Sequence, residues 1–360
     1  MLKIKVFFKQ IAALFLTFSM TVAPLFGVIR QGGKSAFFDN WSASDAFTAD
    51  CAVRMDKQPD KDFVILNLTD IQLNNAEAFN EVGAQTKAVI DRLVADTKPD
   101  LITVTGDNGS MFLAYNEMIR MLDSYGIPWA PIMGNHDGHG FPGEFWCAYN
   151  FADAKNCLFR FGPADMGYGN YIIHIYENDQ IIHTLYMMDT HDNIEADNCN
   201  GPKGDGYDHL WENQMLWYAW AVNGTNKLAG KAVDSSVFFH IPLCEYNSAW
   251  NAATEDGKFK AEYAETSFGE KREGVCCAPE NNGFFMLMQR LGSTKNVICG
   301  HDHVNSFSIL YEGIRLTYSL KTGAGAYSDA DMNGGTTLTI ASDGSTTTVH
   351  HYVDAASLTV

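Results

Sequence analysis

The sequence predicts an α/β fold in one large domain, and three observations support this prediction. Short apolar runs of strand type alternate along the chain with segments whose apolar residues recur at helical spacing. The composition is that of a folded protein, because 46% of the 360 residues are hydrophobic and 19% are charged. Residues 61–355 contain no internal repeat, low-complexity tract or shift in composition that would mark a second domain.

The first half of this domain alternates between strands and helices. The elements that we expect are a strand at 63–69, a helix within 77–98 that Pro99 ends, a strand at 101–105, a helix at 115–125 and a strand at 129–133. Strand–helix–strand alternation of this kind predicts a largely parallel, buried sheet with right-handed crossovers.

The second half adds more strands and fewer helices. The expected elements are a hairpin of 171–176 and 181–188, a Trp-rich helix at 209–222, a strand at 237–241, a short helix at 283–291, a strand at 296–299 and strands from 314 onward with a turn at 342–345. Histidines lie at the ends of two of these strands: His240 within 237–241, and His301 just after 296–299.

The N-terminal segment differs from the rest of the chain. Three lysines precede the uncharged, apolar run 11–29, a pattern typical of an export signal that is also long enough to span a bilayer. We expect residues 1–30 to be a signal peptide or an N-terminal membrane anchor, with the two alternatives open, and residues 31–60 to be a polar linker. The protein is then exported, and either secreted or anchored at the extracytoplasmic face of a membrane.

The formal charge of −18 restricts the partners of the protein. It argues against an extended nucleic-acid interface and against docking on anionic lipid, since both need lysine and arginine. It does not exclude a small phosphorylated substrate, because bound cations can invert the local charge.

The eight cysteines do not define a site. No two of them form a CxxC pair, which argues against a thiolate zinc ribbon. In an exported chain an even number permits disulfides, but the sequence cannot assign the pairing, and free buried thiols remain the alternative for several of them.

Polar side chains follow five of the expected strands where each strand ends. The carboxyl ends of strands in an α/β sheet form the crevice where ligands bind, so these side chains are expected to meet. Singly, each could be a turn residue, a helix cap or a core histidine, but the ordered set supplies carboxylate, amide and imidazole donors, which suit Zn, Fe or Mn. They are more than one tetrahedral ion needs, which implies two ions. The residues are Asp70, Asp107, Asn135, His240, His301 and His303.

These blocks resemble the calcineurin-like metallophosphoesterase family. The matching blocks, in order, are Asp70-Ile71-Gln72, Gly106-Asp107-Asn108, Gly134-Asn135-His136-Asp137, His240 and Gly300-His301-Asp302-His303. The stretches 238–243 and 300–305 resemble the PAP29-type branch of the family, which is related to the purple acid phosphatases. The resemblance covers roughly residues 62–330 and implies a four-layer αββα sandwich of mixed sheets, with a metal site at the carboxyl ends of the strands.

The resemblance also implies a role for each residue. Asp70, Asp107 and His303 would hold a first metal ion, Asp107 would bridge, and Asn135, His240 and His301 would complete a second site. His136 matches the family's substrate-facing histidine, so it and Asp107 are the implied catalytic residues; a structural hydrogen bond beside the site is the alternative for His136.

The implied activity is hydrolysis of phosphate mono- or diesters, with a metal-activated hydroxide attacking phosphorus in line and Mn, Zn or Fe as cofactor. Two alternatives stay open. The chain could be a weak or inactive binding protein with reduced metal occupancy, or a protein that holds one zinc ion through His301 and His303. Neither the substrate nor the oligomeric state can be inferred from the sequence.

Two positions depart from the family pattern. The first block carries Gln72 where the family has histidine, so the first site is expected to be weaker, differently loaded, or completed by water, His139 or His191. No tyrosine directly follows Gly106-Asp107, where purple enzymes place their coloured tyrosinate, and Tyr115 lies too far along the chain. A colourless enzyme is expected.

Overall fold

The computed structural model describes residues 41–139, 143–194 and 206–358. The proposed export segment at 1–30 lies outside these residues, as does the first part of the linker. Within them, no helix combines the length and the apolar character that crossing a membrane requires. Six cysteines of these ranges are free thiols, and Cys199 lies outside them. The six are Cys51, Cys147, Cys244, Cys276, Cys277 and Cys299.

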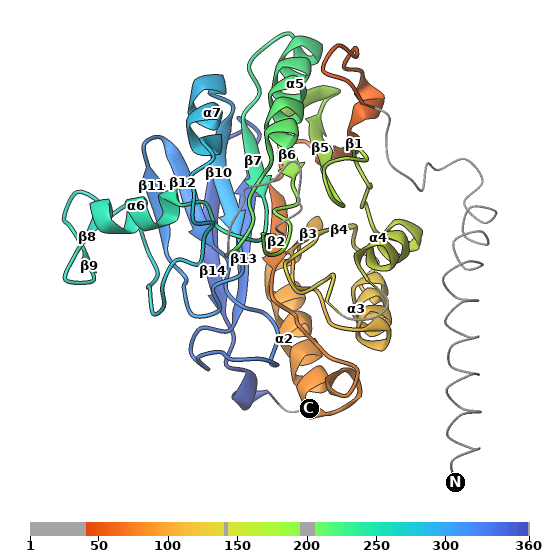
Figure 1. Ribbon diagram of the computed structural model, residues 1–360, viewed down its shortest axis with the longest axis vertical. Coiled ribbons are helices and arrows are strands. Elements are labelled where there is room, and N and C mark those ends of the chain that lie inside the picture. The colour runs from red at the N-terminus through yellow and green to blue at the C-terminus, as the bar shows by residue number, and fades with distance from the viewer. Residues whose placement is uncertain (1–40, 140–142, 195–205, 359–360) are drawn as a thin grey trace.

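Two mixed β-sheets form the centre of the molecule (Figure 1). The larger has the strand order β1-β5-β6-β7-β10-β12-β11 and the smaller β14-β13-β2-β3-β4. The larger sheet contains β1 (Val53–Asp56), β5 (Tyr171–Glu177), β6 (Gln180–Met187), β7 (Ser235–Phe238), β10 (Thr294–Cys299), β11 (Ser308–Tyr311) and β12 (Ile314–Tyr318). The smaller contains β2 (Phe63–Leu68), β3 (Leu101–Thr105), β4 (Trp129–Ile132), β13 (Gly334–Ile340) and β14 (Thr346–Tyr352). A separate hairpin consists of β8 (Thr254–Glu255) and β9 (Lys258–Phe259).

The parallel part of each sheet follows from strand–helix–strand units. Strands β2, β3 and β4 are parallel, and so are β6, β7 and β10, because a crossover separates each pair. The antiparallel pairs β5–β6, β11–β12 and β13–β14 are joined by short turns instead. The prediction of a parallel arrangement is therefore correct for these units and for the pairs β1–β5 and β10–β12, but the strands form two mixed sheets and not one.

Helices cover the outer faces of the two sheets (Figure 1). Helix α2 contacts β2 and β13, while α5 contacts β6 and α7 contacts β10. The helices are α2 (Glu81–Thr97), α3 (Phe112–Ser124), α4 (Glu144–Asp153), α5 (Glu212–Ala229), α6 (Glu245–Ala253) and α7 (Phe284–Leu291), with short 3-10 turns η1 (Ala49–Cys51), η2 (Glu77–Phe79) and η3 (Ala355–Ser357). The Asn80 side chain caps α2 by accepting from Val82 N at 2.8 Å.

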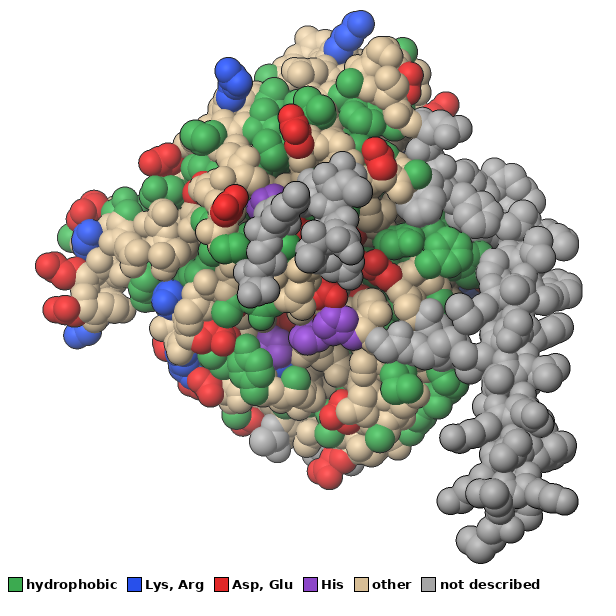
Figure 2. All heavy atoms as spheres, viewed as in Figure 1, with side chains coloured by type: hydrophobic (Ala, Val, Ile, Leu, Met, Phe, Trp, Pro, Cys, Tyr) green, Lys and Arg blue, Asp and Glu red, His purple; other side chains and the backbone are tan. Residues whose placement is uncertain are grey.

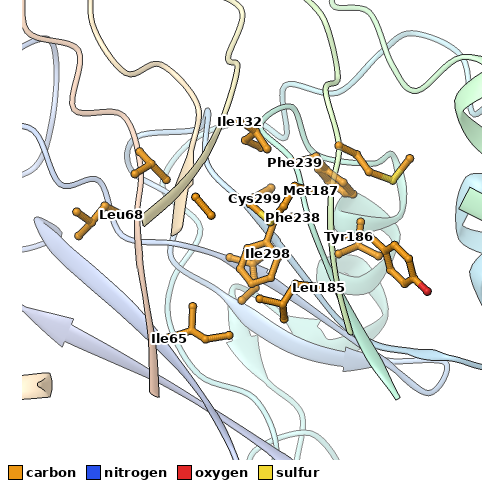
Figure 3. Close-up of a cluster of buried hydrophobic side chains, with 14 of the residues drawn as sticks. Ile65, Leu68, Ile132, Leu185, Tyr186, Met187, Phe238, Phe239, Ile298 and Cys299 are labelled. Carbon is orange, nitrogen blue, oxygen red and sulfur yellow. The ribbon is translucent and has the colours of Figure 1, made fainter. Parts of the chain in front are cut away.

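The inner faces of the sheets pack against each other and form the core. Figure 3 shows Ile65 and Leu68 of β2 facing Leu185 of β6, Phe238 of β7 and Ile298 of β10. All five side chains are fully buried. With helices outside both sheets, this arrangement is the four-layer αββα sandwich, which confirms the expected fold.

Three elements differ from the sequence-based expectation. Residues 53–56, assigned above to the linker, form the edge strand β1, which pairs in parallel with β5. Its side chains alternate between half-buried and exposed over only four residues, a pattern too short to recognise. Helix α4 was not expected, because its own aromatic and small residues are spread around all its faces and give no apolar stripe. Helix α6 was not expected either, and it is short.

Candidate metal centre

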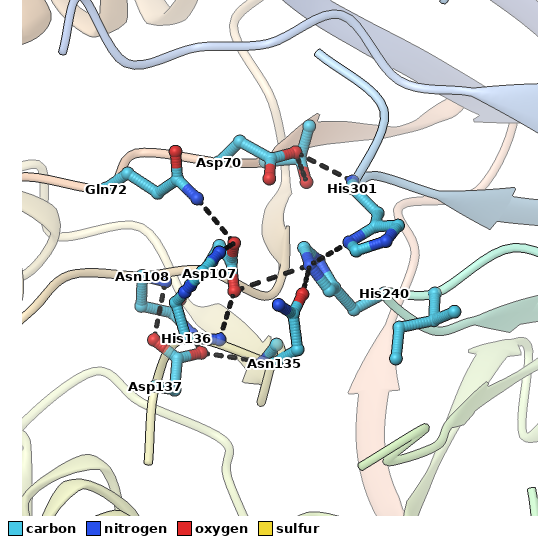
Figure 4. Close-up of polar contacts among 12 residues, drawn as sticks. Asp70, Gln72, Asp107, Asn108, Asn135, His136, Asp137, His240 and His301 are labelled. Atoms are coloured by element: carbon cyan, nitrogen blue, oxygen red, sulfur yellow. Dashed lines mark hydrogen bonds and ion pairs between the residues drawn. The ribbon is translucent and has the colours of Figure 1, made fainter. Parts of the chain in front are cut away.

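The six metal-ligand candidates converge where the carboxyl ends of the parallel strands of both sheets meet. Figure 4 shows five of them, and the sixth, His303, lies beside Asp70 and Asp107. Asp70 and Asp107 follow β2 and β3, Asn135 follows β4, His240 follows β7, and the two remaining histidines follow β10. The structure therefore brings together side chains that are more than two hundred residues apart in the sequence.

The backbone at this edge is strained in a way that aims side chains inward. Asp70, Asp107 and His301 have φ angles of 50°, 50° and 79°, in the left-handed region that non-glycine residues rarely adopt. A Cβ atom at Gly106 would lie 2.7 Å from the His240 Nδ1 atom, so only glycine fits there. Such conformations persist where surrounding structure enforces them, often at functional sites.

One donor cluster contains Asp70, Asp107 and His303. Ligand atoms of these three buried residues all lie within 4.8 Å of one another, a spacing that a single metal ion could bridge. The His303 Nε2 atom is 3.4 Å from Asp70 Oδ1. This set is the one that the sequence assigned to the first metal.

A second donor cluster adjoins the first through Asp107. The His240 Nε2 atom lies 3.4 Å from Asp107 Oδ1 and 3.0 Å from Asn135 Oδ1. The His301 Nδ1 atom lies 3.3 Å from the same His240 nitrogen. Asp107 thus stands between the two clusters, as a bridging ligand must.

Backbone groups fix the orientation of these ligands. His240 donates its Nδ1–H to Thr105 O at 2.8 Å, and His303 donates its Nδ1–H to Tyr327 O at 2.9 Å. Each bond turns Nε2, the nitrogen that a metal ion would bind, toward the carboxylates, as in most metal-binding histidines. Asp70 Oδ2 accepts from His301 N at 3.0 Å, so its other oxygen is left to face the cluster.

Three buried atoms show that the site fits metal ions. Asp70 Oδ1, Gln72 Oε1 and His301 Nε2 are buried and have no hydrogen-bond partner among the described residues. Leaving a buried polar atom unsatisfied costs free energy, and a metal ion at this position would remove that cost. Oxygen and imidazole donors are also the types that Zn, Mn and Fe accept.

The clustered charges shift one another's pKa values. Burial opposes charge on His240, but the Asp107 and Asp70 carboxylates outweigh it and raise the His240 pKa to about 10. Burial likewise opposes ionisation of Asp107, but His240 outweighs this and lowers its pKa to about 2. Burial and the charge of His240 lower the pKa of His301 to about 3, which keeps that imidazole neutral and able to bind metal.

Gln72 lies at the first cluster, in the position that the sequence identified as a departure. Its Nε2 donates to Asp107 Oδ2 at 2.5 Å, while its Oε1 is one of the unpartnered atoms. The suggested substitutes do not join the cluster: His139 bonds Asp192, and His191 bonds Gln214 and stacks on Trp211.

His136 and Tyr115 have different surroundings. The His136 side chain is 53% exposed, and its Nε2 lies 4.0 Å from Asp107 Oδ2, so it borders the clusters on the solvent side. Figure 2 shows histidine and acidic side chains exposed together near the middle of this face. Tyr115 is buried and its hydroxyl donates to the Asp137 carboxylate, away from the ligands.

Two residues that support the site escaped the sequence reasoning. Asp137 accepts from Gly134 N at 2.7 Å and from Asn108 N at 2.8 Å, which ties together the loops that carry Asn135 and Asp107. Lys321 is fully buried, and its Nζ donates to Asp70 O at 2.7 Å. Asp137 stands inside a recognised block, whereas nothing in the sequence around Lys321 signals its position.

The fold and the site define an αββα sandwich that holds a carboxylate–imidazole metal cluster between its sheets. The chain belongs to the calcineurin-like phosphoesterase family, whose profile matches residues 63–305.

The chain is also similar to several named proteins. The chain is 27% identical over 309 residues to the probable inactive purple acid phosphatase 29 of Arabidopsis thaliana, covering 75% of this chain and 74% of the relative. It is 28% identical over 283 residues to the phosphatase DCR2 of Saccharomyces cerevisiae, covering 72% of this chain and 47% of that protein. A solved dimetal phosphatase from Danio rerio is similar with a TM-score of 0.47 and 12% identity, covering 80% of this chain and 98% of that chain.

Proposed function

We propose that this protein is a binuclear-metal-dependent hydrolase of phosphate mono- or diesters. The observation that supports it most is the pair of donor clusters that share Asp107, together with buried polar atoms of Asp70, Gln72 and His301 that have no hydrogen-bond partner among the described residues. Asp70, Asp107, His303 and, through its amide oxygen, Gln72 would hold the first ion. Asp107, Asn135, His240 and His301 would hold the second.

The position of each side chain defines its proposed catalytic role. When bound, the metal pair supplies Lewis acidity and the positive charge that a chain of charge −18 needs near a phosphate ester. Asp107 keeps the two clusters in a fixed relation, because its oxygens contact both His240 and Gln72. The ligands would be shielded from bulk water because they are buried, and the half-exposed His136 marks the side that faces solvent.

His136 is the group placed to handle a proton. Its backbone N donates to Asp107 Oδ1 at 2.9 Å, which anchors the residue to the bridging carboxylate. Its half-exposed ring can reach a substrate bound over the clusters, and imidazole is suited to protonate a leaving oxygen near neutral pH.

Export belongs to the same proposal. The basic and apolar pattern of residues 1–30 supports a signal peptide or membrane anchor. Fractionation of cells that express the full chain, compared with a chain lacking residues 1–30, tests this: we expect only the full chain outside the cytoplasm.

A second candidate is a phosphoesterase fold that binds a partner and turns over no substrate. Gln72 favours it, since its amide already occupies Asp107 Oδ2, and so does the word inactive in the name of the Arabidopsis relative. Metal analysis after loading with Mn²⁺ or Zn²⁺ separates the candidates: about two ions per chain supports the hydrolase, and near-zero metal supports the binding protein.

Turnover provides the direct test. The purified, metal-loaded protein should hydrolyse p-nitrophenyl phosphate or bis(p-nitrophenyl) phosphate. The Asp107→Ala, His240→Ala double variant should lose this activity, whereas Asp179→Ala, which removes an exposed carboxylate that pairs with Arg54, should retain it. Full activity of the double variant would refute the proposal.

A further inference from the structure

We propose that His139 and Asp192 form a hydrogen-bonded pair that positions the His136 imidazole for proton transfer to the leaving oxygen. This inference rests on the proposed function, because it gives His136 two supporting residues. It assigns His139 a role different from the metal ligation considered for it from the sequence.

The three side chains form a continuous chain of contacts. The Asp192 Oδ2 atom lies 2.6 Å from His139 Nε2, and His139 Nδ1 lies 3.1 Å from His136 Nδ1. The two imidazole rings meet edge to face, with centroids 5.1 Å apart and planes at 81°. The other nitrogen of His136, Nε2, is the one that lies 4.0 Å from Asp107 Oδ2.

The hydrogen-bond donors and acceptors along this series of contacts assign the tautomers of His136 and His139. An ionised carboxylate can only accept, so the proton between Asp192 and His139 belongs to His139 Nε2. A neutral His139 then has a lone pair on Nδ1, which accepts the Nδ1–H of His136. The pair therefore directs His136 Nε2 toward the metal clusters. In the imidazolium form of His136 this nitrogen carries the proton that passes to the leaving oxygen, and the transfer leaves His136 as the neutral Nδ1–H tautomer.

The pair is anchored on both sides of the site. His139 belongs to the loop after β4, where its N donates to His136 O at 3.1 Å. Asp192 belongs to the segment after β6, where its O accepts from Asp208 N at 2.9 Å and its Oδ1 accepts from Asn193 Nδ2 at 3.0 Å. The contact thus connects a loop of the smaller sheet with a loop of the larger one.

His136 needs such support because its side chain is 53% exposed. An exposed ring rotates between rotamers, and only a fraction of them point Nε2 at a bound phosphate ester. Holding a catalytic group in its reactive orientation raises the rate without changing the chemistry. His139 and Asp192 are therefore positioning residues, and His136 is the group that would touch substrate.

Leaving-group dependence provides the test. In the metal-loaded protein, Asp192→Ala and His139→Ala should each lower kcat for phenyl phosphate about tenfold, because its leaving oxygen needs a proton. The KM should stay within about twofold, and so should kcat for 2,4-dinitrophenyl phosphate, whose leaving group needs no proton. His139→Gln should restore turnover, since the amide can accept from His136 and donate to Asp192 as the imidazole does.

The controls separate positioning from structural damage and from failure of the proposed function. Asp179→Ala should behave as wild type on both substrates, and metal content should stay unchanged in all variants. Equal losses on both substrates, loss of metal, or unchanged kinetics would overturn the inference. If the wild-type protein hydrolyses neither ester, imidazole ¹⁵N NMR of the zinc-loaded protein decides: a His136 Nδ1–H tautomer that disappears in Asp192→Ala supports the pair, and an Nε2–H tautomer overturns it.

Discussion

Replacing Gln72 by histidine should tighten binding of the first metal ion. In the structure the Gln72 amide donates to Asp107 Oδ2, one of the oxygens that the ion needs, while its own Oε1 is a weaker donor than imidazole. The Gln72→His substitution removes the competing hydrogen bond and adds a nitrogen ligand at the position where the family carries histidine.

The expected increase in metal affinity follows from the Gln72–Asp107 hydrogen bond, which the first ion must break in the wild-type protein. A hydrogen bond to a charged acceptor contributes about 1.5–3 kcal/mol, and Asp107 is buried, with only 1% of its surface exposed. Each 1.4 kcal/mol corresponds to a tenfold change in an equilibrium constant, so first-site affinity should rise between about tenfold and about a hundredfold.

Calorimetric titration of metal-free protein with Zn²⁺ or Mn²⁺, in competition with a chelator, measures this affinity. Circular dichroism checks that each variant is folded. The Gln180→His substitution, at an exposed position of the β5–β6 hairpin, controls for adventitious metal binding by a new histidine. Affinity for the second ion should change little. If Gln72→His binds the first ion no more tightly than wild type, Gln72 does not limit this site and the reasoning is refuted.

Three further predictions concern the core, acid stability and colour. Leu66→Ala, at a fully buried position in β2, should reduce the free energy of unfolding in urea by about 2–5 kcal/mol. Leu216→Ala, at a position that is 54% exposed, should change this free energy by no more than about 0.5 kcal/mol. Similar losses in the two variants would contradict the described packing. Burial lowers the pKa of His183 to about 3, so the stability from its neutral form is complete above about pH 6.5 and lost as the pH falls toward 3, at about 1.4 kcal/mol per unit. His183→Gln should therefore make urea unfolding of the metal-free protein less dependent on pH between 6.5 and 4.5, and an unchanged dependence would argue against this origin. Protein loaded with ferric iron should show no tyrosinate charge-transfer band in its visible spectrum, because Tyr115 bonds Asp137; a purple colour would instead implicate Tyr207, whose ring packs against His301.

The sequence alone determined the central strands and the set of candidate ligands. Buried parallel strands are continuous apolar runs, so β2, β3 and β4 could be located within one residue of their observed ends. The candidate ligands were identifiable because each polar block directly follows such a run. Edge strand β1 and helix α4 carry no comparable pattern, so only packing against the rest of the domain defines them.

What the tertiary structure decided is which groups support those ligands. The Tyr327 carbonyl that orients His303, the Lys321 amine on Asp70 O, and Asp192 beyond His139 come from segments with no recognisable motif. Their roles depend on distances across the two sheets, and a linear pattern encodes local periodicity but not those distances. The sequence therefore established an α/β domain with two carboxylates, an amide and three imidazoles at its strand ends. The packing of one sheet on the other decided which atoms of these residues face each other and which buried atoms remain available to a metal ion.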